Sequence, residues 1–171
     1  DHRDLHSFPT RRSSDLIIGG DHSLAMGSIA GASKHFGNNL AVIWIDAHGD
    51  INTHDTSPSG NIHGMPLAAS MGYGYEKLTS IFFNEVKIKP ENVFILACRD
   101  LDKGEIELIN KLKMNVWTTE QINKEGTSKV INDLLTLIKE KNIKNGKKIQ
   151  ITKSDLCKQI DSSRKYVKGS K

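Results

Sequence analysis

The stretch AVIWIDAHGDIN, residues 41–52, decides the fold of this chain. Its first five residues are all apolar, which is typical of a strand buried on both faces of a parallel sheet. Asp46, His48 and Asp50 follow at intervals of two, so their side chains point to one side if the chain stays extended through them. Two carboxylates and an imidazole directed at one point need a cation to offset their repulsion. The stretch therefore predicts a divalent metal site at a strand end; the alternative is a run of polar loop residues that face water.

Strands and helices alternate along the rest of the chain. The run LIIGG at 16–20 predicts a strand, and the small and apolar residues of 23–37 predict a helix packed closely on a sheet. The pattern continues with predicted strands at 92–98, 114–117 and 147–152, and predicted helices at 103–113 and 127–141. With no hairpin signal between them, these elements predict an α/β fold: a three-layer, open, mainly parallel sheet with helices on both faces.

A second polar motif, GGDHS at 19–23, lies where the first predicted strand ends. Ligands of open parallel sheets lie outside the carboxyl ends of the strands, so GGDHS and DAHGD are expected to face one crevice. His22 then adds a second imidazole. Asp21 and Ser23 are equally good helix caps, so the motif alone leaves His22 as a ligand or as a helix-start residue. Carboxylate-rich sets with one or two imidazoles suit Mn²⁺, Mg²⁺ or Fe²⁺ better than structural zinc.

Length and composition indicate one soluble globular domain. The chain has 171 residues, of which 37% are hydrophobic and 26% charged. No apolar run approaches the roughly 20 residues that a membrane span needs, so no membrane partner is expected. Cys98 and Cys157 are too few for a disulfide framework and favour a reducing, cytoplasmic compartment.

The net charge of +4 is concentrated near the C-terminus. From Lys139 onward there are 11 Lys and Arg against 3 Asp and Glu, a balance of +8, which leaves −4 for residues 1–138. Tyr166 alone interleaves the lysines, so we interpret 153–171 as a solvated basic tail of uncertain origin rather than a nucleic-acid-binding module.

The N-terminal segment differs in character from the rest. HSFPTRRSSDL, residues 6–16, resembles in every residue the in-frame translation of a common short-read sequencing adapter. We therefore predict that residues 1–16 are non-native and that 17–152 form a partial α/β domain. A natural polar N-terminus, with Pro9 and Ser13 in a loop, is the alternative.

Three motifs in order, GGDHS, DAHGDIN at 46–52 and SGNIHGMPLA at 59–68, closely resemble those of arginases, within the ureohydrolase family of manganese enzymes. The likeness continues through CRDLDKGE at 98–105 to about Ile151 and covers the middle portion of a family domain. The resemblance implies an arginase-like fold, here incomplete, and hydrolysis of L-arginine to L-ornithine and urea with two Mn²⁺. It also implies a small-molecule substrate, no nucleic-acid partner and a homo-oligomeric complete protein.

The resemblance assigns metal ligands position by position. It implies that His22 and Asp50 bind one manganese, that His48 binds the other and that Asp46 bridges the pair. Two such ions lower the pKa of a shared water so that hydroxide exists near neutral pH, as attack on a guanidinium carbon requires.

Further histidines differ in what the resemblance gives them. His63, in GNIHG, matches the family's proton-shuttling histidine, which helps to protonate the departing amine. Taken alone, it reads as a loop histidine against the sheet rim. His35 and His54 match no family role and are interpreted as surface residues.

The loop after the metal motif and the CRDLDKGE motif match the family's substrate-binding positions. The resemblance implies neutral donors to the substrate α-carboxylate at Asn52, Ser57, Ser59 and Asn61, and acids for its α-amino group at Asp102 and Glu105. A guanidine without the carboxylate leaves those donors unpaired, which favours arginine over agmatine. As isolated residues they are ordinary turn formers and helix-start acids.

The C-terminal part departs from the family pattern. Family members carry a further strand that ends in an Asp-x-Asp pair and completes both metal shells, and a later glutamate that contacts the guanidinium. The expected strand is KKIQIT at 147–152, but no such pair follows it, and Asp155 and Asp161 are six apart. We therefore expect weakened metal binding and no turnover from this chain as written. An agmatinase-like amidinohydrolase and a non-catalytic fragment or pseudoenzyme remain the alternatives.

Overall fold

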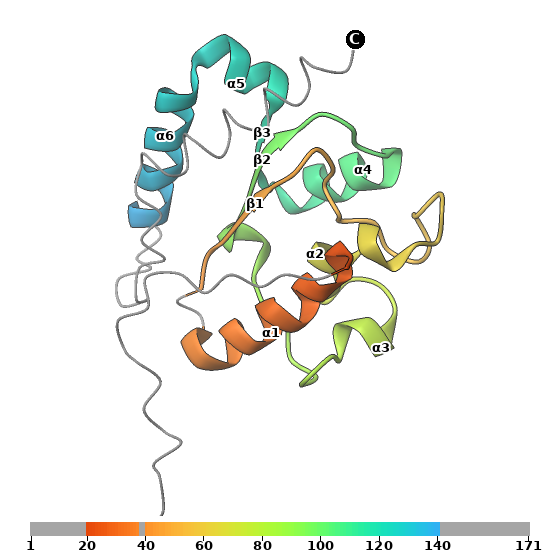
Figure 1. Cartoon of the computed structure of the whole chain (residues 1–171). Coiled ribbons are helices and arrows are strands. Elements are labelled where there is room, and N and C mark those ends of the chain that lie inside the picture. Colours follow the sequence, from red (N-terminus) through yellow and green to blue (C-terminus); the bar gives the residue numbers. More distant parts are fainter. Residues whose placement is uncertain (1–19, 38–39, 141–171) are drawn as a thin grey trace, which may run out of the picture.

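The structure, a computed structural model, describes residues 20–37 and 40–140 (Figure 1). The chain forms three strands, six α-helices and three short 3-10 helices in this part. In order these are η1 (His22–Leu24), α1 (Ala25–Phe36), β1 (Val42–Ile45), η3 (Ile62–Gly64), α2 (Pro66–Ser70), α3 (Glu76–Thr79), η4 (Pro90–Asn92), β2 (Val93–Cys98), α4 (Lys103–Leu112), β3 (Asn115–Thr118), α5 (Thr119–Glu125) and α6 (Thr127–Glu140). None of these helices is long and apolar enough to span a bilayer.

The three strands form one parallel sheet in the order β1-β2-β3. Trp44 of β1 pairs with Ile95 of β2, and Ile95 pairs in turn with Val116 of β3. Helix α4 connects β2 to β3, as a parallel pair requires. The predicted parallel α/β sheet is confirmed in this part of the chain.

Side chains of β2 alternate between two hydrophobic clusters, one on each face of the sheet. Val93 and Ile95 are fully buried in the cluster that packs against α1, α2 and α4. Phe94 and Leu96 are fully buried in the cluster that packs against α5 and α6. Figure 1 shows α5 and α6 on one side of the strands and α1, α2 and α4 on the other. The predicted three-layer arrangement, with helices on both faces, is therefore confirmed.

A β-bulge interrupts this alternation at Ala97. The pairing shifts between Leu96, opposite Trp117, and Cys98, opposite Thr118, and Ala97 adopts a left-handed backbone with φ of 67°. The extra residue brings Cys98 back to the cluster that holds Ile95, where it is fully buried. The bulge thereby sets the side of the sheet on which the loop after β2 continues.

Loops after β1 and β2 meet immediately beyond the bulge. The backbone amides of Arg99 and Asp100 both donate to the carbonyl oxygen of Ala47, at 2.8 and 3.0 Å. The Thr119 hydroxyl donates to the carbonyl oxygen of Ala97 at 2.6 Å and secures the bulge from the neighbouring strand end. These bonds join the carboxyl ends of β1 and β2 into one rim.

Most predicted elements of the described part are present, within a residue or two at their ends. The structure also contains α2, α3 and α5, which sequence periodicity did not predict. Helix α5 is short but begins with a capping box formed by Thr118 and Gln121. The predicted strand at 147–152 and the segments 1–16 and 153–171 lie outside the described residues, as does nearly all of the predicted strand at 16–20.

Candidate metal centre

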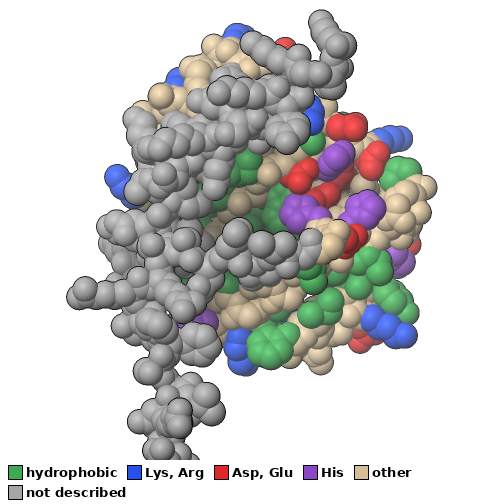
Figure 2. Space-filling view, viewed as in Figure 1, with side chains coloured by type: hydrophobic (Ala, Val, Ile, Leu, Met, Phe, Trp, Pro, Cys, Tyr) green, Lys and Arg blue, Asp and Glu red, His purple; other side chains and the backbone are tan. Residues whose placement is uncertain are grey.

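Histidines and acids gather at the carboxyl ends of β1 and β2. Figure 2 shows His side chains and Asp or Glu side chains side by side on one face of the molecule. The residues come from η1, from the loop after β1 and from the loop after β2, and ion pairs join them as His22, Asp46, His48, Asp50 and Asp100. The two motifs predicted to face one crevice are brought together.

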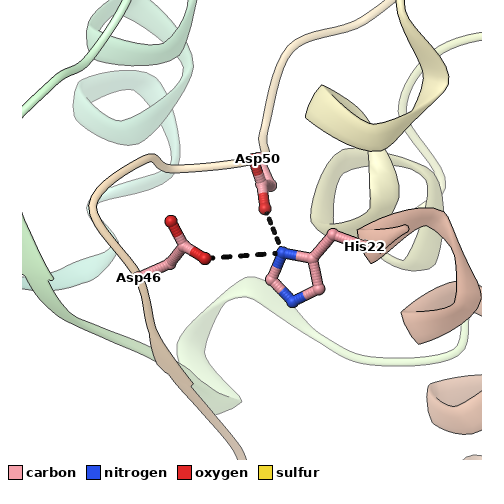
Figure 3. A group of neighbouring side chains, drawn as sticks. All are labelled: His22, Asp46 and Asp50. Atoms are coloured by element: carbon pink, nitrogen blue, oxygen red, sulfur yellow. Dashed lines mark ion pairs between the residues drawn. The ribbon is translucent and has the colours of Figure 1, made fainter. Parts of the chain in front are cut away.

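His22 lies between two carboxylates (Figure 3). Its Nδ1 is 2.7 Å from Oδ2 of Asp50 and 3.5 Å from Oδ2 of Asp46. Each of the three residues offers one ligand atom, and these atoms lie within 4.8 Å of one another. A cluster of one imidazole and two carboxylates at this spacing can hold a divalent cation.

Asp46 faces a second histidine through its other oxygen. Oδ1 of Asp46 accepts a hydrogen bond from the backbone N–H of His48 at 2.9 Å and lies 3.2 Å from Nδ1 of the same residue. His48 Nε2 is 3.9 Å from Oδ2 of Asp100. Asp46 therefore lies between His22 and His48, with one carboxylate oxygen toward each.

The loop from Asp46 to Asp50 is bent, contrary to the extended strand on which the sequence argument rested. Strand β1 ends at Ile45, and Asp50 adopts a left-handed backbone with φ of 51°. The side chains of Asp46 and Asp50 converge because the chain turns, and not because they alternate along a strand. The premise of an extended stretch was wrong, although the residues it selected do lie together.

Electrostatics at Asp50 favour a bound cation. The Asp50 side chain is buried, and its burial, followed by repulsion from Asp46, raises the pKa of its carboxyl; His22 acts in the opposite direction. A divalent cation would relieve both causes, since it attracts the ionised carboxylates that burial and mutual repulsion disfavour. The donor set therefore fits a hard or borderline divalent ion.

Asp21 caps the helix that positions His22. Its Oδ1 accepts the backbone N–H of Ser23 at 2.9 Å, and hydrogen bonding from Ser23 lowers the pKa of Asp21. The cap is therefore the work of Asp21, which leaves the His22 ring free to face Asp46 and Asp50. Oδ2 of Asp21 lies 3.4 Å from Nδ1 of His63, so the third motif also reaches this rim.

Comparison with known proteins decides the family. The family model described as "Arginase family" matches residues 3–145.

The chain belongs to the arginase family. It is 57% identical over 120 residues to the arginase of Brevibacillus brevis, a match covering 70% of this chain and 40% of that protein. A crystal structure of arginase from Bacillus subtilis superposes with a TM-score of 0.69 at 52% identity, over 71% of this chain and 42% of that one. Arginase from Entamoeba histolytica in complex with L-ornithine superposes with a TM-score of 0.68 at 38% identity, over 75% of this chain and 45% of that one. This chain spans about 40% of the length of the curated relatives it matches.

The family resemblance drawn from the three motifs is thus confirmed. The residues that the family model matches, 3–145, include the rim just described. Among the remaining residues predicted from the arginase resemblance, hydrogen bonds link Asn52 to Asp102 and Glu105 to the backbone of Ile51.

Asn52 lies at the centre of a hydrogen-bond network next to the loop from Asp46 to Ile51, which we call the metal loop. It is buried, its Nδ2 donates to Oδ2 of Asp102 at 2.8 Å, and its Oδ1 accepts from the Thr56 hydroxyl at 2.9 Å. Among the expected donors to a substrate carboxylate, Ser57 and Ser59 accept backbone N–H groups of Gly60 and Asn61, at 3.0 and 3.2 Å. Each serine hydroxyl keeps its own proton to donate.

Glu105 is buried, unlike the neighbouring acid Asp102. Glu105 is 3% exposed. Its Oε1 accepts the backbone N–H of Ile51 at 3.1 Å, and its Oε2 accepts the backbone N–H of Asp102 at 3.0 Å. Burial raises the pKa of the Glu105 carboxyl, and the two hydrogen bonds act against it. Both oxygens are therefore directed at backbone amides.

Sequence reasoning missed two residues of this rim. Trp44, the third residue of β1, stacks on the His22 ring, and Asp100 lies beside His48. Asp100 could have been found from its place in the motif at 98–105. His35 and His54 are exposed, as expected for surface histidines, and contact Phe36 and Asp55 respectively.

Proposed function

We propose that the intact protein containing this sequence is an arginase, which hydrolyses L-arginine to L-ornithine and urea with two Mn²⁺. The observation that carries the proposal is Asp46 between two histidines, with Oδ2 3.5 Å from His22 Nδ1 and Oδ1 3.2 Å from His48 Nδ1. A bridging ligand to two metals needs such a two-sided carboxylate. On this proposal His22 and Asp50 hold one ion, His48 holds the other, and Asp46 binds both.

Held by His22, Asp46, His48 and Asp50, a metal pair would lower the pKa of a bound water molecule, so that hydroxide would be available near neutral pH. Asp46 and Asp50 contribute the negative charge that retains divalent ions in this place. Burial of Asp50 strengthens its interaction with a cation because less water screens the charges.

His63 is proposed to carry the proton to the departing amine. Its imidazole is exposed and lies 3.4 Å from the Asp21 carboxylate, beside the metal ligand His22. A histidine with access to solvent and a neighbouring carboxylate can exchange protons near neutral pH.

The substrate preference rests on the loop that follows the metal motif. Asn52, Ser57, Ser59 and Asn61 offer neutral donors to an α-carboxylate. Asp102, which accepts from Asn52 Nδ2 at 2.8 Å, and Glu105 are the acids for the α-amino group. Agmatine has no carboxylate to accept from the serines and Asn61. The ornithine complex of the Entamoeba histolytica relative supports an amino-acid ligand for this fold.

The isolated chain is proposed to bind metal weakly and not to turn over, because KKIQIT at 147–152 is not followed by an Asp-x-Asp pair. Cytoplasmic location and homo-oligomeric assembly of the intact protein, without nucleic-acid or membrane partners, belong to the same proposal. So does the non-native origin of residues 1–16.

A chimera tests the function. Residues 20–140 of this chain replace the matching segment of the Bacillus subtilis arginase, and urea release from L-arginine is measured with Mn²⁺, beside the amine product from agmatine. We expect the chimera to hydrolyse arginine faster than agmatine, and Asp46→Ala to abolish this activity. Faster agmatine hydrolysis, or an active Asp46→Ala chimera, contradicts the proposal.

A further inference from the structure

Glu105 links two segments that are far apart in sequence. It lies on the first turn of α4, and its Oε1 reaches Ile51 N–H, which follows directly on the metal-site residue Asp50. Its Oε2 closes back on Asp102 N–H at the start of the same helix. One buried carboxylate thus satisfies two backbone donors, one from the metal loop and one from the helix that carries the predicted amino-group acid.

The two segments approach each other closely at two glycines. A Cβ on Gly49 would lie 2.9 Å from Glu105 Oε1, and a Cβ on Gly104 would lie 2.5 Å from Thr56 Cβ. Neither distance occurs between real Cβ atoms and their neighbours. The loop at 49–56 and the start of α4 therefore pack directly on each other's backbone.

Three bonds hold the backbone of the metal loop after it turns at Asp50. The Asp50 carbonyl accepts Leu67 N–H at 3.0 Å, and Asn52 N–H donates to the Gly64 carbonyl at 3.1 Å. Between these two backbone bonds, Ile51 N–H donates to the Glu105 side chain. Of the three, the Glu105 bond is the one that a side chain provides.

We propose that Glu105 is a positioning residue that fixes the metal loop against α4, so that the metal ligands and the amino-group subsite move as one body. The proposal rests on the proposed function for the identity of the metal. It adds to the role implied by the resemblance: Glu105 supports the amino-group subsite through the backbone of Asp102. A carboxylate suits this position because it presents two acceptors to two donors.

Two substitutions in the full chain test this positioning role of Glu105, which we call the clamp. Glu105→Gln keeps the size of the side chain but replaces one acceptor by a donor, so either Ile51 or Asp102 loses its partner; Glu105→Met removes both acceptors. Hydrogen exchange of backbone amides is measured without metal, as the protection of Ile51 and Asp102 relative to that of Ile95 in the sheet. We expect roughly a tenfold or greater loss of relative protection at one of the two amides in Glu105→Gln and at both in Glu105→Met.

Two controls separate positioning from loss of charge or of stability. Glu107→Gln removes the same charge from the same helix, at an exposed side chain 3.8 Å from Lys103. Ile131→Val removes a buried methylene from the opposite face of the sheet and lowers stability without touching the rim. Both are expected to leave the relative protection of Ile51 and Asp102 unchanged. Unchanged protection in both Glu105 variants, or an equal local loss in Ile131→Val, overturns the clamp.

Titration of Mn²⁺ alone into the same proteins gives the second readout. We expect Glu105→Gln to weaken Mn²⁺ binding by roughly tenfold or more, whereas Glu107→Gln and Ile131→Val bind as the parent does. Parent chain that binds no Mn²⁺ contradicts the weak metal binding proposed for the isolated chain, and the exchange data then decide the clamp independently. Intact Mn²⁺ affinity in a Glu105 variant with lost amide protection contradicts the coupling of loop and site.

Discussion

The His22 ring stacks on Trp44, with centroids 4.2 Å apart and planes 22° apart. Trp44 is 6% exposed and lies in the same hydrophobic cluster as Ile95, so the core of the sheet extends directly to a residue of the metal centre. The orientation of His22 toward Asp46 and Asp50 thus depends on packing as well as on charge.

Truncation of Trp44 should therefore affect both stability and metal binding. We expect Trp44→Ala to lower the free energy of unfolding by about 3–5 kcal/mol and to weaken Mn²⁺ binding, because the cavity also frees the His22 ring. Trp44→Phe keeps an aromatic face and should cost about 1–2 kcal/mol, since Trp44 Nε1 has no hydrogen-bond partner in the described part of the chain. Urea unfolding followed by circular dichroism measures the change in free energy of unfolding for both substitutions. Equal costs for Phe and Ala would show that an aromatic ring at this position contributes nothing to stability.

The bulge residue Ala97 stores backbone strain that glycine can release. A left-handed conformation costs a residue with a Cβ about 1–2 kcal/mol. Glycine avoids this cost, but its greater conformational entropy in the unfolded state offsets part of the stabilisation. We expect Ala97→Gly to raise the free energy of unfolding by roughly 0.5–1 kcal/mol and Ala97→Val to lower it. Thermal unfolding of the three proteins checks the order, and a destabilising glycine would mean that the Ala97 methyl contributes more by packing than it costs in strain.

A matched pair of Gly→Ala changes separates close packing from helix propensity. Gly104→Ala places a Cβ against Thr56 and should destabilise the chain by about 1–3 kcal/mol. Gly31→Ala, within α1, meets no atom of the described residues within 4 Å and should stabilise it by about 0.5–1 kcal/mol. Opposite shifts of the unfolding midpoint are expected. A neutral Gly104→Ala would mean that the loop at 53–57 moves away at little cost.

The buried side chain of Lys87 predicts a pH dependence of stability at alkaline pH. Its Nζ donates to the carbonyl oxygens of Thr79 and Phe83, and burial lowers its pKa below 10.5. Between the native and the unfolded pKa of Lys87, the unfolded state binds more protons than the native state, so the free energy of unfolding rises with pH. This gain in stability is lost again as pH falls through the native pKa.

We expect Lys87→Met to cost roughly 1–3 kcal/mol at neutral pH, because both carbonyls lose their donor. The difference in free energy of unfolding between parent and Lys87→Met should then grow as pH rises toward 10.5. Urea titrations at neutral and alkaline pH measure this difference. A difference that shrinks with rising pH would contradict the burial of a charged amine at this position.

Much of the fold could be predicted because its strands are buried on both faces and read as continuous apolar runs. Phe94 and Ile95 face opposite clusters, yet both must be apolar, so the run at 92–98 has no polar alternation to confuse with a surface strand. Short helices such as α2 were missed, because five residues carry too little periodicity to be recognised.

The sequence selected residues that lie together, but it did not predict how the chain brings them together. Motif order selected Asp46, His48 and Asp50, whereas the bend that brings them together depends on contacts with residues distant in sequence. Ile51 is held by Glu105, 54 positions away, and the backbone of Asp50 by Leu67. A left-handed aspartate cannot be inferred from local sequence when tertiary hydrogen bonds maintain it.

The extra residue in β2 has a consequence for how this fold tolerates change in length. Deletion of one residue of the strand ahead of the bulge, with the bulge retained, would shift the alternation of the residues that follow and turn Cys98 toward the layer of α5 and α6. The amides of Arg99 and Asp100 would then leave Ala47, and the acidic motif would emerge on the wrong side of the sheet. Insertions and deletions in this strand should therefore be tolerated far less than substitutions. A change in length moves every following side chain to the other face of the sheet, and no choice of residue type corrects this.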